Sequence, residues 1–210
     1  MLTLYSAPGT CALASHLALE HARADYKLVR LDFSRDEQRS PDYLKINPKG
    51  RVPALATEHG ILTETPALLL YIAQAFPQAR LAPLDDPYAL AQVQEFNSYI
   101  SSTVHVAHAH GRRGARWVDA GDTHALEAMK KKLPQSMGDT FLPIEAKYLR
   151  GPWVMGEQLT VCDYYLFTMA LWLEGDGVDL SRLPRVMEHR ARLQADPLVQ
   201  RVLESQRAPA

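Results

Sequence analysis

The segment LTLYSAPGTCALASHLALEHA, residues 2–22, predicts a strand, a tight turn and a helix in direct succession. Leu2–Tyr5 is a short β-prone run, and the Pro-Gly pair at positions 8–9 interrupts it. From near Thr10 or Cys11 onward, leucines recur among helix-forming residues, which indicates a helix. A strand that leads straight into a helix is typical of the start of an α/β domain.

The alternation of strands and helices continues through the first eighty residues. Further strands are predicted at Tyr26–Leu31, Val52–Ala56 and Ile61–Thr63, and further helices after Ser40–Pro41 and over Glu64–Ala75. The Glu58-His59-Gly60 segment predicts a hairpin between the last two strands. This order fits one mixed sheet covered by helices.

After a proline-rich linker at residues 81–87, the pattern changes to long helical periodicity. Helices are predicted at Tyr88–His110, Thr123–Tyr148, Thr160–Leu173, Leu183–Gln194 and Pro197–Ser205. Within the second of these, we expect an interruption or kink near Pro134 and Pro143. The sequence therefore predicts an α/β domain over residues 1–80 and an all-helical domain over residues 88–210.

Composition excludes several broad classes of protein. The 210 residues carry a formal net charge of -1, and 47% of them are hydrophobic. A nucleic-acid binder that works through bulk charge would be basic, so we expect no nucleic-acid partner. No apolar run approaches the roughly 18 residues of a membrane span, so we expect no membrane association. The start of the chain lacks the features of a secretory signal, and the two cysteines indicate a reducing compartment, so the expected location is the cytoplasm.

Cys11 is the first candidate for chemistry, because it lies at the predicted strand-to-helix turn. The positive end of a helix dipole favours a thiolate, and the thiolate is the nucleophilic form of cysteine. The alternative is a small buried residue that only packs in the first turn of the helix. No second cysteine stands three residues further on, so a thioredoxin-type dithiol is excluded.

Val52–Pro53 is the second candidate, since a proline directly before an apolar strand is an unusual place to begin pairing. One interpretation is a cis peptide bond that leaves the amide and carbonyl of Val52 unpaired. Such an edge can pair with a short peptide as one more strand. The alternative is an ordinary trans proline at the first position of an edge strand, which is much the commoner isomer.

Glu64 and Thr65 open a predicted helix and form the third candidate. Amide and hydroxyl groups at a helix N-terminus attract a carboxylate, while the carboxylate of Glu64 is an acceptor for an amino group. The alternative is that Thr63 or Thr65 is only a helix cap, with Glu64 complementing the helix dipole.

Three segments together resemble the thioredoxin-like domain of cytosolic glutathione S-transferases. They are Tyr5 with the turn at 8–11, NPKGRVPAL at 47–55 and LTETPALLLYIA at 62–73. In the helical half, GEQLTVCD at 156–163 resembles the buried capping segment of the same family, with Thr160 and Asp163 spaced as a capping box. A cysteine at this turn is similar to the bacterial beta class of the family.

The resemblance implies roles for particular residues. It implies a thioredoxin-like N-terminal domain with a mixed four-stranded sheet and an all-α C-terminal helical bundle. It implies a cis Val52–Pro53 bond, with the Val52 backbone on the cysteinyl part of glutathione and Glu64 and Thr65 at the γ-glutamyl end. Cys11 and His105 would act on the glutathione sulfur. The implied glutathione-binding set is Tyr5, Thr10, Arg35, Arg51, Val52, Pro53, Glu64, Thr65 and Ser98.

Polar residues also recur at helical spacing on the predicted helix Tyr88–His110 and just beyond it. Ser98, Ser101, His105, His108 and Arg112 follow one another at intervals of three or four residues. We interpret this stripe as one wall of a cleft for a second substrate, with His108 and Arg112 in that wall. The alternative is a solvated helix face. A metal site is disfavoured, because no nearby carboxylate or cysteine completes a tetrahedral ligand set.

The resemblance thus implies a glutathione S-transferase that uses glutathione as co-substrate and forms a homodimer, and the residues themselves indicate no metal. Its role would be detoxification, either by conjugation of electrophiles or by thiol-disulfide and peroxide reduction through Cys11. The alternatives are a non-catalytic protein of the same fold that binds glutathione or a protein partner, and a specialised transferase of aromatic catabolism.

Overall fold

The strand β1 (Leu2–Ser6) lies inside a four-stranded sheet of order β2-β1-β3-β4 in the computed structural model, which describes residues 1–207. It pairs in parallel with β2 (Tyr26–Arg30) and antiparallel with β3 (Ala54–Thr57). β3 turns back into β4 (Gly60–Thr63) to form a hairpin. The predicted mixed sheet and hairpin are confirmed.

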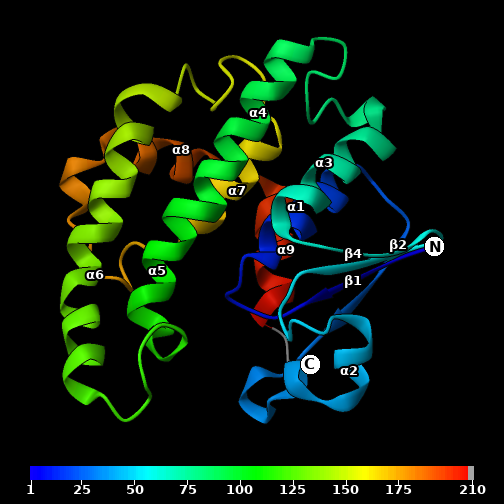
Figure 1. The fold of residues 1–210 in the computed structure, drawn as a ribbon. Helices are drawn as coiled ribbons and strands as arrows, with labels where there is room; N and C mark the ends of the chain where they lie inside the picture. Colours follow the sequence, from blue (N-terminus) through cyan, green and yellow to red (C-terminus); the bar gives the residue numbers. More distant parts are fainter. Residues whose placement is uncertain (208–210) are drawn as a thin grey trace. The chain divides into compact units, whose positions relative to one another are not determined.

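Helices cover both faces of this sheet (Figure 1). α1 (Ala12–His21) and α3 (Thr65–Ala75) lie on one side, and α2 (Pro41–Ile46) lies on the other. Every residue of α1 from Ala12 to Leu19 is buried, because this helix contacts β1, α3 and α9 (Pro197–Arg207). A mostly apolar helix is typical of such a central position, although α1 also buries the polar residues Ser15 and His16. We predicted α9 as part of the all-helical domain over residues 88–210, but in the structure it packs on α1.

Residue contacts divide the chain into two units. Of the described residues, the first unit contains 1–93 and 193–207, and the second is Gln94–Arg192. The two boundaries fall inside helices, namely α4 (Pro87–Tyr99) and α8 (Pro184–Gln194).

The second unit is helical. α5 (His105–Arg112) packs along α6 (Thr123–Pro143), and α7 (Val161–Ala170) has all ten of its residues buried. The predicted capping box at the start of α7 is confirmed, since Thr160 and Asp163 bond reciprocally to each other's backbone amides. Within residues 1–207, no helix has the length and apolar character needed to cross a lipid bilayer.

Two π-helical turns correct the predicted helix boundaries. Ile100–Val104 is π-helical and separates α4 from α5, so the single helix expected over Tyr88–His110 is wrong in its middle. A second π-helix, Ile144–Tyr148, follows α6, whereas α6 itself continues through Pro134. A π turn fits one extra residue between otherwise regular turns, and the spacing of apolar residues alone does not reveal it.

The buried side chain of His16 on α1 should make the stability of the first unit sensitive to acid. Its ring is buried, lies 3.1 Å from the Gln206 side chain on α9, and packs edge-on against Tyr26. Burial lowers the pKa of His16 to about 4, against the opposing influence of Glu20. The folded pKa is below the unfolded one, so the resulting stability is complete above pH 6.5 and is lost as the pH falls towards 4.

Between pH 6.5 and pH 4, the wild type should therefore lose about 3 kcal/mol more stability than His16→Gln. Urea denaturation at a series of pH values measures the difference, and other acid-sensitive groups affect both proteins alike. Parallel pH profiles for the two proteins would contradict the prediction.

Candidate active site

Cys11 follows the turn that joins β1 to α1. The Thr10 hydroxyl donates to the carbonyl of Ala7 at 2.7 Å and accepts from the amide of Ala12 at 3.4 Å. Gly9 has a φ of 71°, which favours glycine. Thr10, which was expected to bind glutathione, thus also holds the turn that presents Cys11.

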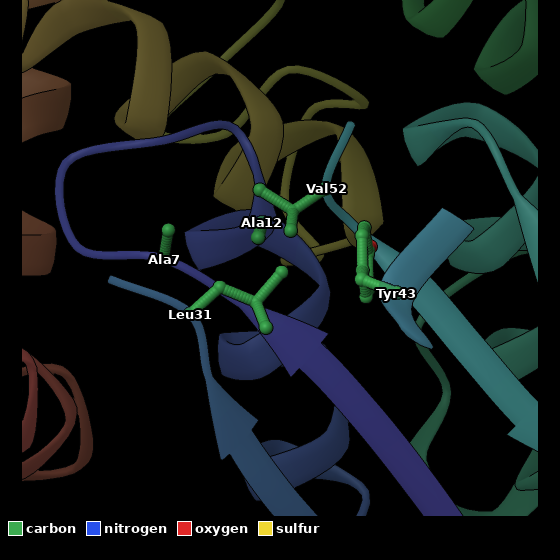
Figure 2. Packing of buried hydrophobic residues seen from close by; sticks show 5 residues of the cluster. All are labelled: Ala7, Ala12, Leu31, Tyr43 and Val52. Carbon is green, nitrogen blue, oxygen red and sulfur yellow. The ribbon is translucent and has the colours of Figure 1, made fainter. Parts of the chain in front are cut away.

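A small apolar cluster fixes this turn against the segment that precedes β3. Figure 2 shows its members, whose side chains come from the turn, α1, the end of β2, α2 and the segment before β3: Ala7, Ala12, Leu31, Tyr43 and Val52. All five are buried. Two segments about forty residues apart in sequence are therefore held side by side.

The Cys11 thiol donates to the carbonyl oxygen of Val52 across this junction, with Sγ and O 3.5 Å apart. The Val52–Pro53 peptide is cis, as the family resemblance implied. The expectation that both Val52 backbone groups are unpaired is wrong for the carbonyl, because the thiol reaches it. The Val52 amide donates no hydrogen bond to any of residues 1–207.

Burial dominates the ionisation of Cys11. It raises the pKa of the thiol to about 11, and a hydrogen bond with the Thr65 side chain and the positive charge of Arg51 oppose it only in part. The position at the start of α1 led us to expect help for the thiolate from the helix dipole. Removal of the thiol from water outweighs that help, so at neutral pH Cys11 carries its proton.

The loop before Val52 is held by residues that the sequence analysis did not select. The carbonyl of Arg51 accepts from the Asn47 amide at 2.6 Å and from the Tyr43 hydroxyl at 2.7 Å. Asn47 also accepts from the backbone amides of Lys49 and Gly50. Gly50 has a φ of 59°, and a Cβ there would lie 3.0 Å from a backbone oxygen. The NPKG turn sequence was the available signal for this network.

Replacement of Asn47 by alanine should destabilise the protein by about 1–3 kcal/mol. The carbonyl of Arg51 would lose a donor and the amide of Lys49 would lose its acceptor. Asn47 is only 1% exposed. Urea denaturation provides the measurement. Lys45→Ala is the matched control: Lys45 lies on the preceding helix in an exposed ion pair, whose loss should change little. Equal midpoints for the two variants would refute the role of Asn47.

Glu64 and Thr65 lie at the N-terminus of α3. Glu64 is the capping residue, with a φ of 75° and no hydrogen bond from its side chain to the helix, so the simple threonine-cap alternative is wrong. Its carboxylate instead pairs with the ammonium of Lys49, which also donates to the Thr63 hydroxyl at 2.7 Å. Thr65 is buried. Lys49 was not predicted, since its partner lies 15 residues away.

Tyr5 and Arg35 were also expected to bind glutathione, and both lie in the first unit. The Tyr5 ring lies 5.7 Å from the Tyr43 ring and packs against the cluster of Figure 2. Arg35 is exposed and lies 3.8 Å from the carboxylate of Glu37. Their predicted contacts with glutathione stay predictions.

In the second unit, the π-helix interrupts the predicted polar stripe. Ser98 lies before the π-helix, where its carbonyl accepts from the Ser101 hydroxyl at 3.0 Å, whereas His105 begins α5 beyond it. The residues of the stripe therefore do not share one continuous α-helical face. Asn97 beside Ser98 is fully buried, and neither polar atom of its side-chain amide has a hydrogen-bond partner among residues 1–207.

The later part of the stripe belongs to a cluster around Trp172 and Asp176. The His105 and His108 rings lie 5.3 and 4.1 Å from the Trp172 ring. His108 and Arg112 both contact the buried carboxylate of Asp176, at 2.6 and 3.0 Å. Within the described residues, no group of three histidine, cysteine or acidic side chains is arranged to hold a metal ion.

The fold and the Cys11 turn define a protein with a thioredoxin-like N-terminal domain and a mostly helical C-terminal region. Residues 1–74 match the family model described as glutathione S-transferase, N-terminal domain. The chain is 45% identical to a Sulfitobacter glutathione transferase homologue, whose crystal structure contains bound glutathione; the match covers 98% of both chains, with a TM-score of 0.92. It therefore belongs to the glutathione S-transferase family.

Other relatives match over the same length. The beta class glutathione S-transferase of Sphingomonas chungbukensis is 30% identical over 98% of both chains, with a TM-score of 0.83. Glutathione S-transferase GstA of Escherichia coli O157:H7 is 28% identical over 98% of both chains.

Proposed function

We propose that the protein is a beta-class glutathione transferase that binds glutathione along residues 1–80. The Val52 amide and carbonyl would pair with the cysteinyl backbone of glutathione as one more strand. Glu64 would accept the α-ammonium group, while the Thr65 hydroxyl and the start of α3 would bind the adjacent carboxylate. The remaining predicted contacts come from Tyr5, Thr10, Arg35, Arg51, Pro53 and Ser98.

The bond from the Cys11 thiol to the Val52 carbonyl supports this proposal best. The cysteinyl amide of glutathione needs the same carbonyl, so its arrival would free the S–H group of Cys11. That group would then donate to the glutathione sulfur and stabilise its thiolate. A protonated Cys11 favours this donor role, and hence conjugation to electrophiles, over nucleophilic attack on disulfides or peroxides.

His105 is proposed to handle the proton that glutathione loses, since neutral imidazole accepts protons near physiological pH. Residues 88–210 would carry the site for the electrophile, with His108 and Arg112 among its residues. The similarity to the beta class protein of Sphingomonas chungbukensis supports the subtype. A cytoplasmic homodimer completes the proposal, and the absence of a disulfide between Cys11 and Cys162 is in keeping with that location.

Calorimetric titration with glutathione and conjugation of 1-chloro-2,4-dinitrobenzene test the function together. We expect wild-type binding and turnover, a loss of about tenfold to a hundredfold in turnover for Cys11→Ala, and retention of most activity in Cys11→Ser, whose hydroxyl can still donate. Cys162→Ala is the matched control. Absence of glutathione binding would overturn the proposal.

A second experiment separates the donor role from the nucleophilic one. Intact mass spectrometry after exposure to oxidised glutathione should show little adduct at pH 7 in the wild type and none in Cys11→Ala. Rapid, complete adduct formation at pH 7, combined with equal inactivity of Cys11→Ser and Cys11→Ala, would assign a redox mechanism instead.

A further inference from the structure

His108, which the proposed function places at the electrophile site without a specific role, is paired with Asp176. The Nδ1 atom of His108 lies 2.6 Å from Oδ2 of Asp176, whose side chain has no exposed surface. A carboxylate only accepts hydrogen bonds, so Nδ1 carries the proton. In the neutral ring, Nε2 is then left with a free lone pair.

The surroundings hold the His108 ring in this orientation. It stacks on Trp172 with the ring centres 4.1 Å apart and an angle of 25° between the planes. Arg112 occupies the other oxygen of Asp176 at 3.0 Å and also donates to the carbonyl of Gly175. Both oxygens of the carboxylate and one face of the imidazole are therefore fixed.

A second histidine in the same unit shows what a purely structural pair looks like. His189 bonds through Nε2 to the buried Asp163, but its side chain is only 1% exposed and its Nδ1 is enclosed without a partner among residues 1–207. The His108 side chain is 19% exposed, and its Nε2 bonds to nothing in that part of the chain. His108 thus combines a fixed tautomer with access from outside.

We propose that Nε2 of His108 is a hydrogen-bond acceptor for the second substrate and that Asp176 is its positioning residue. The inference rests on the proposed transferase function, which it deepens by naming a class of electrophile. Arg112 is already paired with Asp176, so the cluster favours a neutral donor over an anion. Trp172 and His105 add aromatic rings beside the acceptor. The substrate class is an aromatic electrophile that carries a hydrogen-bond donor such as a phenolic hydroxyl.

Binding of 4-ethylphenol, compared with ethylbenzene, tests the acceptor without any reaction. The wild type should bind the phenol about threefold to tenfold more tightly than His108→Asn does, while ethylbenzene should bind both equally. The asparagine amide can replace the Nδ1 donor to Asp176 but offers nothing at the position of Nε2. His110→Asn, on the same helix beside Trp117, is the control and should behave as wild type.

Nitrogen NMR of the histidine rings tests the positioning role. His108 should show a protonated Nδ1 in the wild type, with its Nε2 resonance shifting on addition of 4-ethylphenol. Asp176→Asn should alter this tautomer and lower phenol affinity while ethylbenzene binding persists. Equal phenol binding by wild type and His108→Asn, or a wild-type His108 protonated at Nε2, would overturn the inference.

Turnover of two isothiocyanates connects the acceptor to the reaction. The wild type should have a higher kcat/KM for 2-(4-hydroxyphenyl)ethyl isothiocyanate than for its deoxy analogue, and His108→Asn should lose that preference through KM. If the phenol result holds but glutathione neither binds nor reacts, the proposed transferase function fails and the acceptor site stands. If glutathione conjugation proceeds without any hydroxyl preference, the transferase function stands and the inference fails.

Discussion

Alkylation of Cys11 by iodoacetamide should accelerate about tenfold with each pH unit between pH 7 and pH 10. Burial raises the pKa of this thiol to about 11, so at pH 7 only about one molecule in ten thousand carries the reactive thiolate. Each added pH unit below the pKa raises that fraction about tenfold. Peptide mapping after timed quenching measures the rate at Cys11 separately from that at Cys162.

Free glutathione is the reference thiol in the same reaction mixture. Its alkylation should level off above about pH 9, where an ordinary thiol is mostly ionised, while the rate at Cys11 continues to rise. A Cys11 rate that levels off at or below pH 8 would show that the helix dipole and the Arg51 charge outweigh burial. The redox mechanism would then be favoured over the donor role.

The stability of the first unit should also depend on the ionisation of the Cys11 thiol. A pKa that is higher in the folded state than in the unfolded state contributes stability at neutral pH, which is lost as the pH rises from 9 through 11. The buried thiol is therefore a stabilising group in its protonated form. This is consistent with Cys11 being a packed residue that also donates a hydrogen bond, whereas the sequence analysis set packing against a nucleophilic thiolate.

The sequence predicted the elements whose signals are local. The β1 strand, the turn at positions 8–9 and the start of α1 are specified within twenty residues, and the capping box of α7 within four. The cis bond before Pro53 was implied only by resemblance, because the local sequence also fits a trans bond.

The features that were missed depend on contacts between distant residues. Asp176 lies 64 residues from Arg112 in sequence, so spacing along one helix placed Arg112 in a stripe without revealing its partner. The π turn before His105 changes which residues share a face, although its sequence has no distinctive signal. The ionisation of Cys11 depends on how completely the folded chain excludes water, which composition does not specify.

Asp163→Ala should cost about 3–5 kcal/mol of stability, because the carboxylate is fully buried and accepts four hydrogen bonds. Oδ1 accepts from the amide of Val154 at 2.8 Å and from His189 at 3.0 Å. Oδ2 accepts from the amide and the hydroxyl of Thr160 at 2.7 and 3.2 Å. Alanine removes the acceptor for all of these donors at once, inside a unit whose central helix begins at this point.

Asp179→Ala is the matched control, since Asp179 caps a short exposed helix through a bond to the amide of Ser181. Its loss should cost about 1 kcal/mol, the usual value for a helix cap. Thermal and urea unfolding of protein expressed at low temperature compare the two variants, and soluble yield at 37 °C provides a second measurement if Asp163→Ala does not survive purification. Equal melting temperatures for the two variants would mean that the buried network contributes no more than an ordinary exposed cap. The difference between them therefore measures what the buried hydrogen-bond network of Asp163 adds beyond a single exposed helix cap.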